Sequence, residues 1–266
     1  MGWPYAEVIG EPIAHSLSPA IHNFWLETLH IDAEYRATLV PEAALAEYFR
    51  KRRVDPDWRG CNIAMPHKQA ALAVIDHQDP VSRRIGALNT IVRRDSALFG
   101  HNTDWQAINL VLDTDRLRPE RAVIIGTGGA ARAALEEMRQ AGVGQVDFVS
   151  RSPVRARGLL AEFGLVGDVL GPGDLPVADL LINASPLGMQ GYPAPDLDLS
   201  NIRLMVFDMV YRPTETELLR RAQARGLRTV DGLAMLIHQA AMAFEYFFQR
   251  TPNPVDSPAL RERLTS

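Results

Sequence analysis

"RAVIIGTGGAARAAL", residues 121–135, runs from an apolar strand through a glycine-rich turn into an alanine-rich helix. This is the context in which a βα unit binds a dinucleotide. Glycine lets the backbone turn sharply and approach a pyrophosphate, whose charge the free N–H groups of a helix N-terminus stabilise. The residues predicted to bind a cofactor here are Gly126, Gly128, Gly129 and Ala130.

The next strand, "QVDFVS", indicates which cofactor is bound. At its end an NAD-binding enzyme carries Asp or Glu for the ribose hydroxyls. This chain instead has Ser150, Arg151 and Ser152, with Arg155 one helical turn later. A carboxylate would repel a 2′-phosphate, whereas two guanidinium groups can clamp it. These four residues therefore predict NADP rather than NAD.

Strands and helices alternate on both sides of this stretch, as in "YAEVIG", "CNIAM", "ADLLINA" and "LMVFDMV" with helical segments between them. The alternation predicts an α/β fold with mostly parallel sheets, and a second α/β unit beginning near Arg121. Two local expectations follow. Ser18 should cap the N-terminus of the first helix, and residues 66–76, "PHKQAALAVID", should form a helix.

Composition excludes several classes of protein. The 266 residues are 47% hydrophobic and 23% charged with a net charge of −4, which fits a globular protein and argues against nucleic-acid binding. Cys61 is the single cysteine, and the N-terminus lacks the pattern of a signal peptide. No apolar run is long enough to span a membrane. Seven histidines show no metal-ligand spacing. We expect a cytoplasmic protein without a metal or a membrane partner.

Lysine is rare in this chain, which has two lysines and 26 arginines. Lys51 lies in the basic run "RKRR", but Lys68 follows an apolar stretch and a proline. Arginine is effectively never deprotonated, whereas lysine can give up its proton in a suitable environment. Lys68 is therefore a candidate for proton transfer.

The motifs "GEPIAHSLSPAIHN", "CNIAMPHK", "GALNTI", "GHNTD", "GTGGAAR", "INASPLGM", "DMVY" and "DGLAMLIHQA" follow one another in this order. Their order and spacing resemble the shikimate dehydrogenase family from end to end. The resemblance implies a substrate-binding and catalytic domain at 1–104 and an NADP-binding Rossmann domain at 105–231. The helices of 232–266 would return to the first domain.

The resemblance also implies the reaction and its residues. The family reduces 3-dehydroshikimate to shikimate reversibly with NADP(H), a step towards chorismate and the aromatic amino acids. Lys68 and Asp104 match the catalytic positions, where the lysine would act as a base, a proton shuttle or a binding contact. Substrate-binding positions are matched by Ser16, Ser18, Asn62, Asn89, Tyr211 and Gln239. The loop lining the nicotinamide is matched by Asn183, Ser185 and Gly188.

Three positions depart from the family pattern. Ala64 stands where Thr is usual, Trp105 follows the catalytic Asp in place of a frequent Gly, and Ala234 replaces Gly in the last helix. They leave open quinate or aminoshikimate as the substrate, and a ligand sensor of the same fold without turnover. The expected partner is a small molecule, and the protein is expected to be a monomer or a homodimer.

Overall fold

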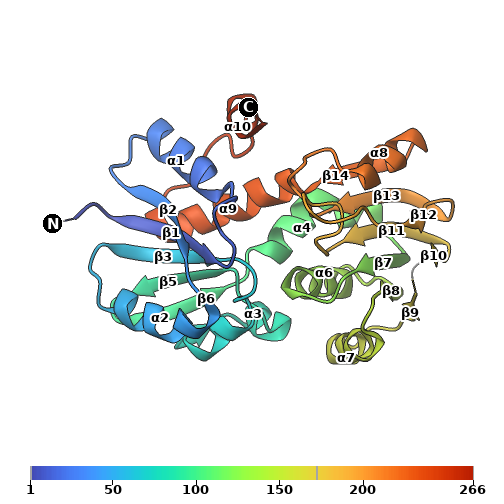
Figure 1. The fold of residues 1–266 in the computed structure, drawn as a ribbon, viewed down its shortest axis with the longest axis horizontal. Helices are drawn as coiled ribbons and strands as arrows, with labels where there is room; N and C mark the ends of the chain where they lie inside the picture. Colours follow the sequence, from blue (N-terminus) through green and yellow to red (C-terminus); the bar gives the residue numbers. More distant parts are fainter. Residues whose placement is uncertain (1, 172, 266) are drawn as a thin grey trace. The chain divides into compact units, whose positions relative to one another are not determined.

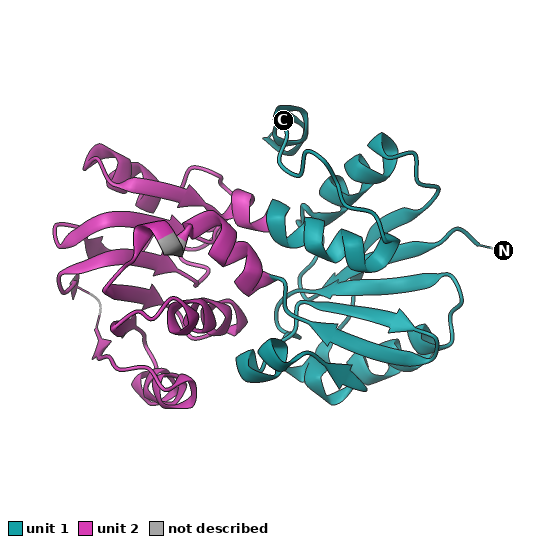
Figure 2. Ribbon diagram, turned by 180° about the vertical axis from the view of Figure 1, so that it is seen from behind, with its two compact units in different colours: residues 1–103, 237–266 teal, residues 104–236 magenta. Residues whose placement is uncertain are grey.

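The computed structural model describes residues 2–171 and 173–265. It divides into two compact units, one of residues 1–103 with 237–266 and one of residues 104–236 (Figure 2). Asp104 is thus the first residue of the second unit. Within the described residues, no helix combines the length and the apolar character needed to cross a bilayer.

The second unit is built on a six-stranded sheet in the order β14-β13-β11-β7-β8-β9, and all its strand pairs are parallel (Figure 1). Chain order reverses between β7 and β11, so this is the switch point where Rossmann sheets bind ligands. The strands are β7 (Arg121–Ile125), β8 (Gln145–Val149), β9 (Val169–Leu170), β11 (Ala178–Asn183), β13 (Ile202–Asp208) and β14 (Arg228–Asp231). Strands β10 (Gly173–Asp174) and β12 (Leu197–Asp198) form a separate small pair.

Both faces of this sheet are covered, because alternate residues of each strand point to opposite sides. Ala122 and Ile124 join a core made with α4 (Asp104–Leu112), α6 (Gly129–Gln140) and α7 (Pro153–Phe163). Val123 and Ile125 join a second core, made with α8 (Glu217–Ala224). The short helix α5 (Thr114–Leu117) follows α4.

The first unit contains another six-stranded sheet, ordered β2-β1-β3-β5-β6-β4. The strands are β1 (Tyr5–Gly10), β2 (Glu34–Leu39), β3 (Trp58–Ile63), β4 (His77–Gln78), β5 (Thr90–Arg94) and β6 (Ala97–His101). Strand β5 runs antiparallel to β3 and β6. A two-residue turn at Asp95 and Ser96 joins β5 to β6, and Asp95 adopts φ 55°, which Asp tolerates better than most residues. This hairpin was not predicted from the sequence.

Helices again cover both faces of the sheet. Helix α2 (Leu45–Arg53), preceded by η1 (Glu42–Ala44), packs on the face that holds Cys61. Helices α1 (Ser18–Thr28) and α9 (Gly232–Phe248) meet on the other face, where Phe244 contacts Trp25. Phe247 occupies the space that a Cβ at position 60 would need, so only glycine fits there. The remaining helices are α3 (Pro80–Ile85) and α10 (Pro258–Thr265).

The α/β architecture agrees with the expectation from the sequence, but two local predictions are wrong. Ser18 is the first helical residue of α1 rather than its cap, and the cap residue is Leu17, whose side chain makes no capping hydrogen bond. Residues 66–76 form turns and only the short 3₁₀ helix η2 (Ala70–Ala73). The carbonyl of Lys68 accepts the N–H of Leu88 at 2.7 Å, and this long-range bond replaces the one that a continuing helix would make.

Candidate active site

Three of the predicted substrate-binding residues form one hydrogen-bonded cluster in the first unit. The Asn62 amide in β3 donates to the Asn89 carbonyl at 3.2 Å and to Thr90 Oγ1 at 3.0 Å. The Asn89 amide donates to Gln239 Oε1 of α9 at 3.2 Å. Residues far apart in the chain are therefore held together in one hydrogen-bonded cluster beside the sheet.

Thr103 lies at the centre of this cluster, although it is not one of the predicted substrate-binding residues. Its N–H donates to Asn89 Oδ1 at 2.7 Å, and its Oγ1 accepts from the Asn89 amide at 2.9 Å. Its hydroxyl also lies 3.1 Å from the Gln239 carbonyl oxygen. The side chain is fully buried. Thr103 thus fixes which way the Asn89 amide points, and only its place in "GHNTD" gave a signal of this.

Tyr35 orients Asn62 in the same way. The Tyr35 hydroxyl donates to Asn62 Oδ1 at 2.6 Å, and the Tyr35 ring stacks on His22 with centroids 3.9 Å apart. The Asn62 amide oxygen accepts this hydrogen bond, and its amide nitrogen donates two others. Only one orientation of the amide therefore satisfies all three hydrogen bonds. A polar side chain held in this manner is preorganised to receive a ligand.

Ser16 and Ser18 lie where β1 leads into α1. The Ser18 N–H donates to Ser16 Oγ at 3.3 Å, and α1 has no acidic residue in its first turn. The N-terminus of the helix therefore offers N–H groups and a favourable dipole to a carboxylate, beside two short hydroxyls. This arrangement suits the acid group of a cyclic hydroxy acid.

Lys68 is held by its backbone. Besides the bond from Leu88 to the Lys68 carbonyl, the neighbouring His67 is buried and its Nε2 lies 2.7 Å from the Val40 carbonyl oxygen. The Lys68 side chain is half-buried. Asp104, in the second unit, is 4% exposed and begins α4, where the helix dipole stabilises a carboxylate.

The glycine loop of the second unit lies at the switch point of its sheet. Gly126 has φ 97°, and a Cβ there would lie 2.9 Å from the Ala184 carbonyl oxygen, so the loops after β7 and β11 touch. Gly128 occupies the N-cap position of α6 and has no side chain to accept a hydrogen bond from the helix. A Cβ on it would meet no atom within 4 Å. Gly129 and Ala130 open that helix. Open space before uncapped N–H groups fits a pyrophosphate.

The residues predicted to bind the 2′-phosphate of NADP lie at the end of β8. Ser152 occupies the N-cap position of α7, but its side chain accepts no hydrogen bond from the helix. Its N–H donates to Ser150 Oγ at 3.1 Å. Arg151 and Arg155 are exposed beside it. A second uncapped helix N-terminus with two arginines, and no carboxylate from 149 to 155, fits a phosphate monoester.

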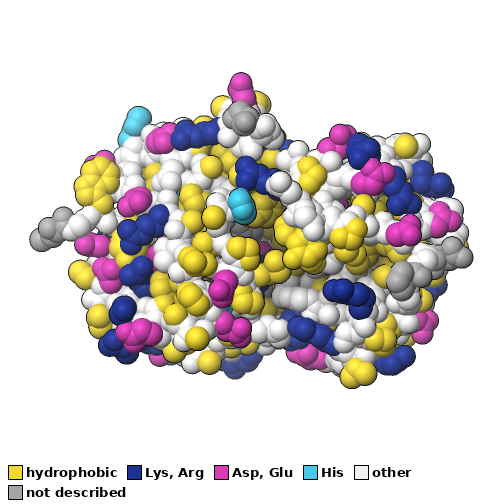
Figure 3. Space-filling view, viewed as in Figure 1, with side chains coloured by type: hydrophobic (Ala, Val, Ile, Leu, Met, Phe, Trp, Pro, Cys, Tyr) yellow, Lys and Arg dark blue, Asp and Glu magenta, His cyan; other side chains and the backbone are white. Residues whose placement is uncertain are grey.

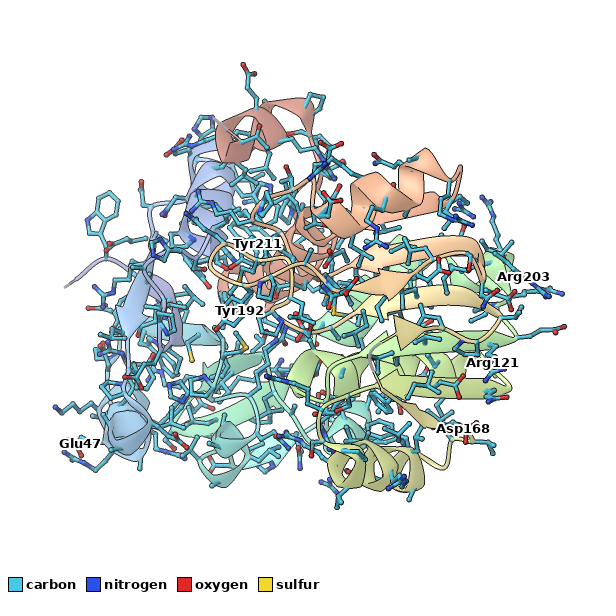
Figure 4. The ribbon with its side chains drawn as sticks, turned by 45° about the vertical axis from the view of Figure 1, so that its right-hand side comes forward. Glu47, Arg121, Asp168, Tyr192, Arg203 and Tyr211 are labelled. Carbon is cyan, nitrogen blue, oxygen red and sulfur yellow. The ribbon has the colours of Figure 1, made fainter. Side chains whose placement is uncertain are left out.

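The "INASPLGM" segment follows β11. Asn183 is fully buried, and Ser185 and Gly188 lie in the half-buried loop after it. Tyr211 follows β13 by three residues, and its burial raises the pKa of its hydroxyl. Figure 4 shows Tyr211 and Tyr192 far from Arg121 and Arg203, which lie near the opposite ends of the strands of this unit.

The residues that depart from the family pattern have structural explanations in part. Trp105 packs against the core under α4 and α6. The Ala234 N–H donates to Asp231 Oδ1 at 2.8 Å, so Ala234 belongs to the first turn of α9. Ala64 is half-buried, and its N–H donates to the Ile9 carbonyl at 2.8 Å. Nothing in these contacts requires alanine rather than threonine at position 64.

Other ionisable side chains serve local roles. His101 Nδ1 lies 3.3 Å from Asp79, which also accepts from Ser82 at the start of α3. Cys61 is a core residue, and burial raises the pKa of its thiol. No cluster of His, Cys, Asp and Glu suited to a metal occurs within residues 2–171 and 173–265. On the face in Figure 3, basic side chains are interspersed with acidic ones.

Two family models and a relative match this chain. Residues 8–91 match the model of the shikimate dehydrogenase substrate binding domain, and residues 232–256 match that of the shikimate 5′-dehydrogenase C-terminal domain. The shikimate dehydrogenase (NADP(+)) of Sphingopyxis alaskensis is 49% identical over 267 residues, which cover 99% of this chain and 97% of the relative.

Two solved structures show the same fold along nearly the whole chain. Shikimate 5-dehydrogenase from Thermus thermophilus, in complex with NADP(H) and shikimate, has a TM-score of 0.86 and 36% identity, with 98% of each chain covered. Ligand-free 5-ketofructose reductase of a Gluconobacter species has a TM-score of 0.88 and 30% identity, covering 99% of this chain and 98% of the other.

Proposed function

Because the chain belongs to the shikimate dehydrogenase family, we propose that it catalyses the NADP-dependent, reversible reduction of 3-dehydroshikimate to shikimate. The observation that carries the proposal is the 49% identity with an NADP-dependent shikimate dehydrogenase along 99% of this chain. The reaction is a step towards chorismate and the aromatic amino acids. We assign it to the cytoplasm and to a monomer or homodimer.

The substrate is held by the first unit. Ser16, Ser18 and the N-terminus of α1 receive the carboxylate, since this group of hydroxyls and N–H donors is complementary to an anion. Asn62, Asn89 and Gln239 receive the ring hydroxyls, and their preorganisation by Tyr35 and Thr103 supports this role. Tyr211 is assigned a further substrate contact.

Proton transfer is assigned to Lys68 and Asp104. Reduction of the ketone requires a proton for the oxygen at C3, and oxidation of the alcohol requires its removal. A half-buried lysine can supply and accept that proton, whereas an arginine at the same place would not. Asp104 is assigned the second role in this transfer, because a general acid or base usually has a partner group that supports it.

The second unit holds the cofactor. Gly126, Gly128, Gly129 and Ala130 receive the pyrophosphate. The 2′-phosphate goes to Ser150, Arg151, Ser152 and Arg155, and the nicotinamide lies along Asn183, Ser185 and Gly188. When bound, NADPH supplies the hydride.

Alternative substrates are separated by one kinetic panel. Purified protein is assayed with NADP⁺ against shikimate, quinate and aminoshikimate, and with NADPH against 3-dehydroshikimate and 5-ketofructose. We expect the highest kcat/KM with the shikimate pair. A higher value for another substrate would replace shikimate, and binding without turnover of any compound would leave a sensor.

Ser18→Ala sharpens the panel. It should raise the KM of every carboxylic acid that turns over by roughly 10-fold, because it removes a hydrogen bond to a charged group. Any turnover of 5-ketofructose, which has no carboxylate, should change little. The Ser18 assignment is wrong if acids and ketohexose respond alike.

A further inference from the structure

Asp208 ends β13 with a fully buried carboxylate that the proposed chemistry does not use. Its Oδ1 accepts from the Asn183 amide at 2.9 Å and from the Val210 N–H at 3.1 Å. Its Oδ2 accepts from Thr216 Oγ1 at 2.7 Å. Each of these donors lies at or beyond the end of a strand, at the carboxyl edge of the second sheet.

Asn183 connects this carboxylate to the loop that follows β11 through hydrogen bonds. Asn183 pairs with Asp208 across β11 and β13, and its amide nitrogen donates both to Asp208 and to the Leu187 carbonyl, the latter at 2.8 Å. Its Oδ1 accepts from the N–H and the hydroxyl of Ser185, at 3.1 and 2.7 Å. A flipped amide would face donors with donors, so Asp208 selects the one orientation that binds the loop.

Residues 184–189 therefore lie between two fixed surfaces. On one side Gly126 contacts Ala184 and Ser185. On the other side Gly188, with φ 90°, faces Asp208 Oδ2 and the Cβ of Thr216, each 3.9 Å from a Cβ built on the glycine. The hydroxyl of Thr216 also accepts the Leu219 N–H and caps α8, so the same carboxylate fixes the start of that helix.

Stability alone gives no reason for a carboxylate at this place. Burial raises the pKa of Asp208, although its three hydrogen bonds act in the opposite direction. Folding raises the pKa of this carboxyl. Its contribution to the free energy of unfolding therefore falls as pH rises from the pKa of the unfolded chain towards the pKa of the folded chain. A buried carboxyl kept at this cost, with three donors directed at its oxygens, points to a requirement for its acceptor geometry.

From these contacts we propose that Asp208 is a positioning residue, which through Asn183 and Thr216 holds residues 184–189 in the shape that receives the nicotinamide end of NADP. The inference rests on the proposed function for the identity of the cofactor. It adds a role for a residue that touches neither substrate nor hydride.

The loop can be measured without any cofactor. Every N–H from 184 to 189, apart from Pro186, donates a hydrogen bond, for example Ala184 to the Ile125 carbonyl at 2.9 Å and Gly188 to the Pro193 carbonyl at 2.8 Å. In Asp208→Ala, amide hydrogen exchange of this segment should become at least about 10-fold faster, since a buried acceptor of three hydrogen bonds is lost.

Asp147 provides a matched control. It is an equally buried carboxylate of the second unit, in β8, and accepts from Arg121 at 2.7 Å and from the Asp168 N–H at 2.8 Å. Figure 4 shows Arg121 and Asp168 well away from Tyr211. Asp147→Ala should destabilise the unit to a similar extent and leave exchange of residues 184–189 at the wild-type rate.

Binding of NADPH, followed by its fluorescence, provides the second measurement. Asp208→Ala should weaken binding by roughly 10-fold and lower kcat, with the KM for shikimate within about twofold of wild type. Asp208→Asn, which keeps an acceptor for Asn183, should recover part of both. Thr216→Val, which removes one donor to Asp208, should show a smaller effect of the same kind if Asp208→Ala does not fold.

The proposal is overturned if the loop exchanges no faster in the Asp208 and Thr216 variants than in Asp147→Ala. It is also overturned if the loop loosens while NADPH affinity and kcat stay at wild-type values, because Asp208 would then serve only the fold. A wild-type protein that binds NADPH but does not oxidise shikimate would instead contradict the proposed substrate, and would leave the result for the loop intact.

Discussion

Thr103 is a single small side chain on which the orientation of a proposed binding group depends. Its backbone N–H and its hydroxyl engage opposite ends of the Asn89 amide. Thr103→Val removes the hydroxyl without changing the shape much, and leaves a buried amide proton without its acceptor. We expect the KM for shikimate to rise roughly 10-fold. NADPH affinity should not change, and Thr103→Ser should restore the wild-type KM in steady-state assays.

Lys68 can be tested against the other lysine of the chain. Lys68→Arg keeps the charge but not the ability to release a proton, so kcat should fall by roughly 100-fold or more. Lys51→Arg is the control, since Lys51 is exposed on α2 and pairs with Glu47 at 3.5 Å. A rise in KM at unchanged kcat would make Lys68 a binding contact instead.

We propose that Arg151 sets the preference for the cofactor with the 2′-phosphate. Arg151→Ala should raise the KM for NADP⁺ by roughly 10-fold, because it removes a charge-assisted contact, and should hardly affect NAD⁺. Arg157→Ala, at an exposed position of α7, should change neither. Equal kcat/KM values of the wild-type protein with the two cofactors would contradict the assignment.

At the scale of elements, α1, β2 and α9 enclose a neutral histidine. His22 is fully buried among Trp25, Tyr35, Phe244 and Phe247, and neither ring nitrogen has a hydrogen-bond partner among the described residues. Burial lowers the pKa of His22 to about 3. The unfolded chain therefore binds this proton at a higher pH than the folded chain, and stability falls as pH drops below about 6.5.

The size of this effect can be measured by denaturant unfolding. Between pH 6.5 and pH 5 the wild-type protein should lose about 1.5 kcal/mol of unfolding free energy because of His22. His22→Leu should not lose this contribution, so the unfolding free energy of the wild type should fall relative to that of the variant as pH is lowered. Parallel stability curves of the two proteins over this range would contradict the linkage.

Some elements could be predicted from sequence because their causes are local. The strand, turn and helix around Gly126 follow from neighbouring residues, and so does the arginine pair at the end of β8. The helix expected at 66–76 is absent because the Lys68 carbonyl is taken by Leu88. A role for Asp208 was not predicted for a related reason. Asn183 and Thr216 contact it only after β11, β13 and α8 are assembled.

At the scale of the molecule, the two units differ in continuity. Residues 104–236 form one unbroken segment with its own sheet and two cores, whereas the first unit combines 1–103 with 237–266. We expect a fragment of residues 104–236 to unfold cooperatively in circular dichroism and to bind NADPH. A fragment of residues 1–103 should not fold, because it lacks Phe247 against Gly60 and Gln239 beside Asn89.

Adding a peptide of residues 237–266 to that fragment should restore a cooperative transition. Because the peptide supplies α10 and most of α9, the recovered signal should depend on peptide concentration. A cooperative transition in residues 1–103 alone would show that the last helices are dispensable for this unit.

The division of the first unit also reverses the usual order of events on the ribosome. Domains generally fold in the order in which they are made, the N-terminal one first. Here the sheet that begins at Tyr5 waits for Phe244 and Phe247, which are synthesised after the whole second unit. The unit that begins before the second one is thus completed after it, and the face that α9 covers stays uncovered until Phe244 and Phe247 have been synthesised.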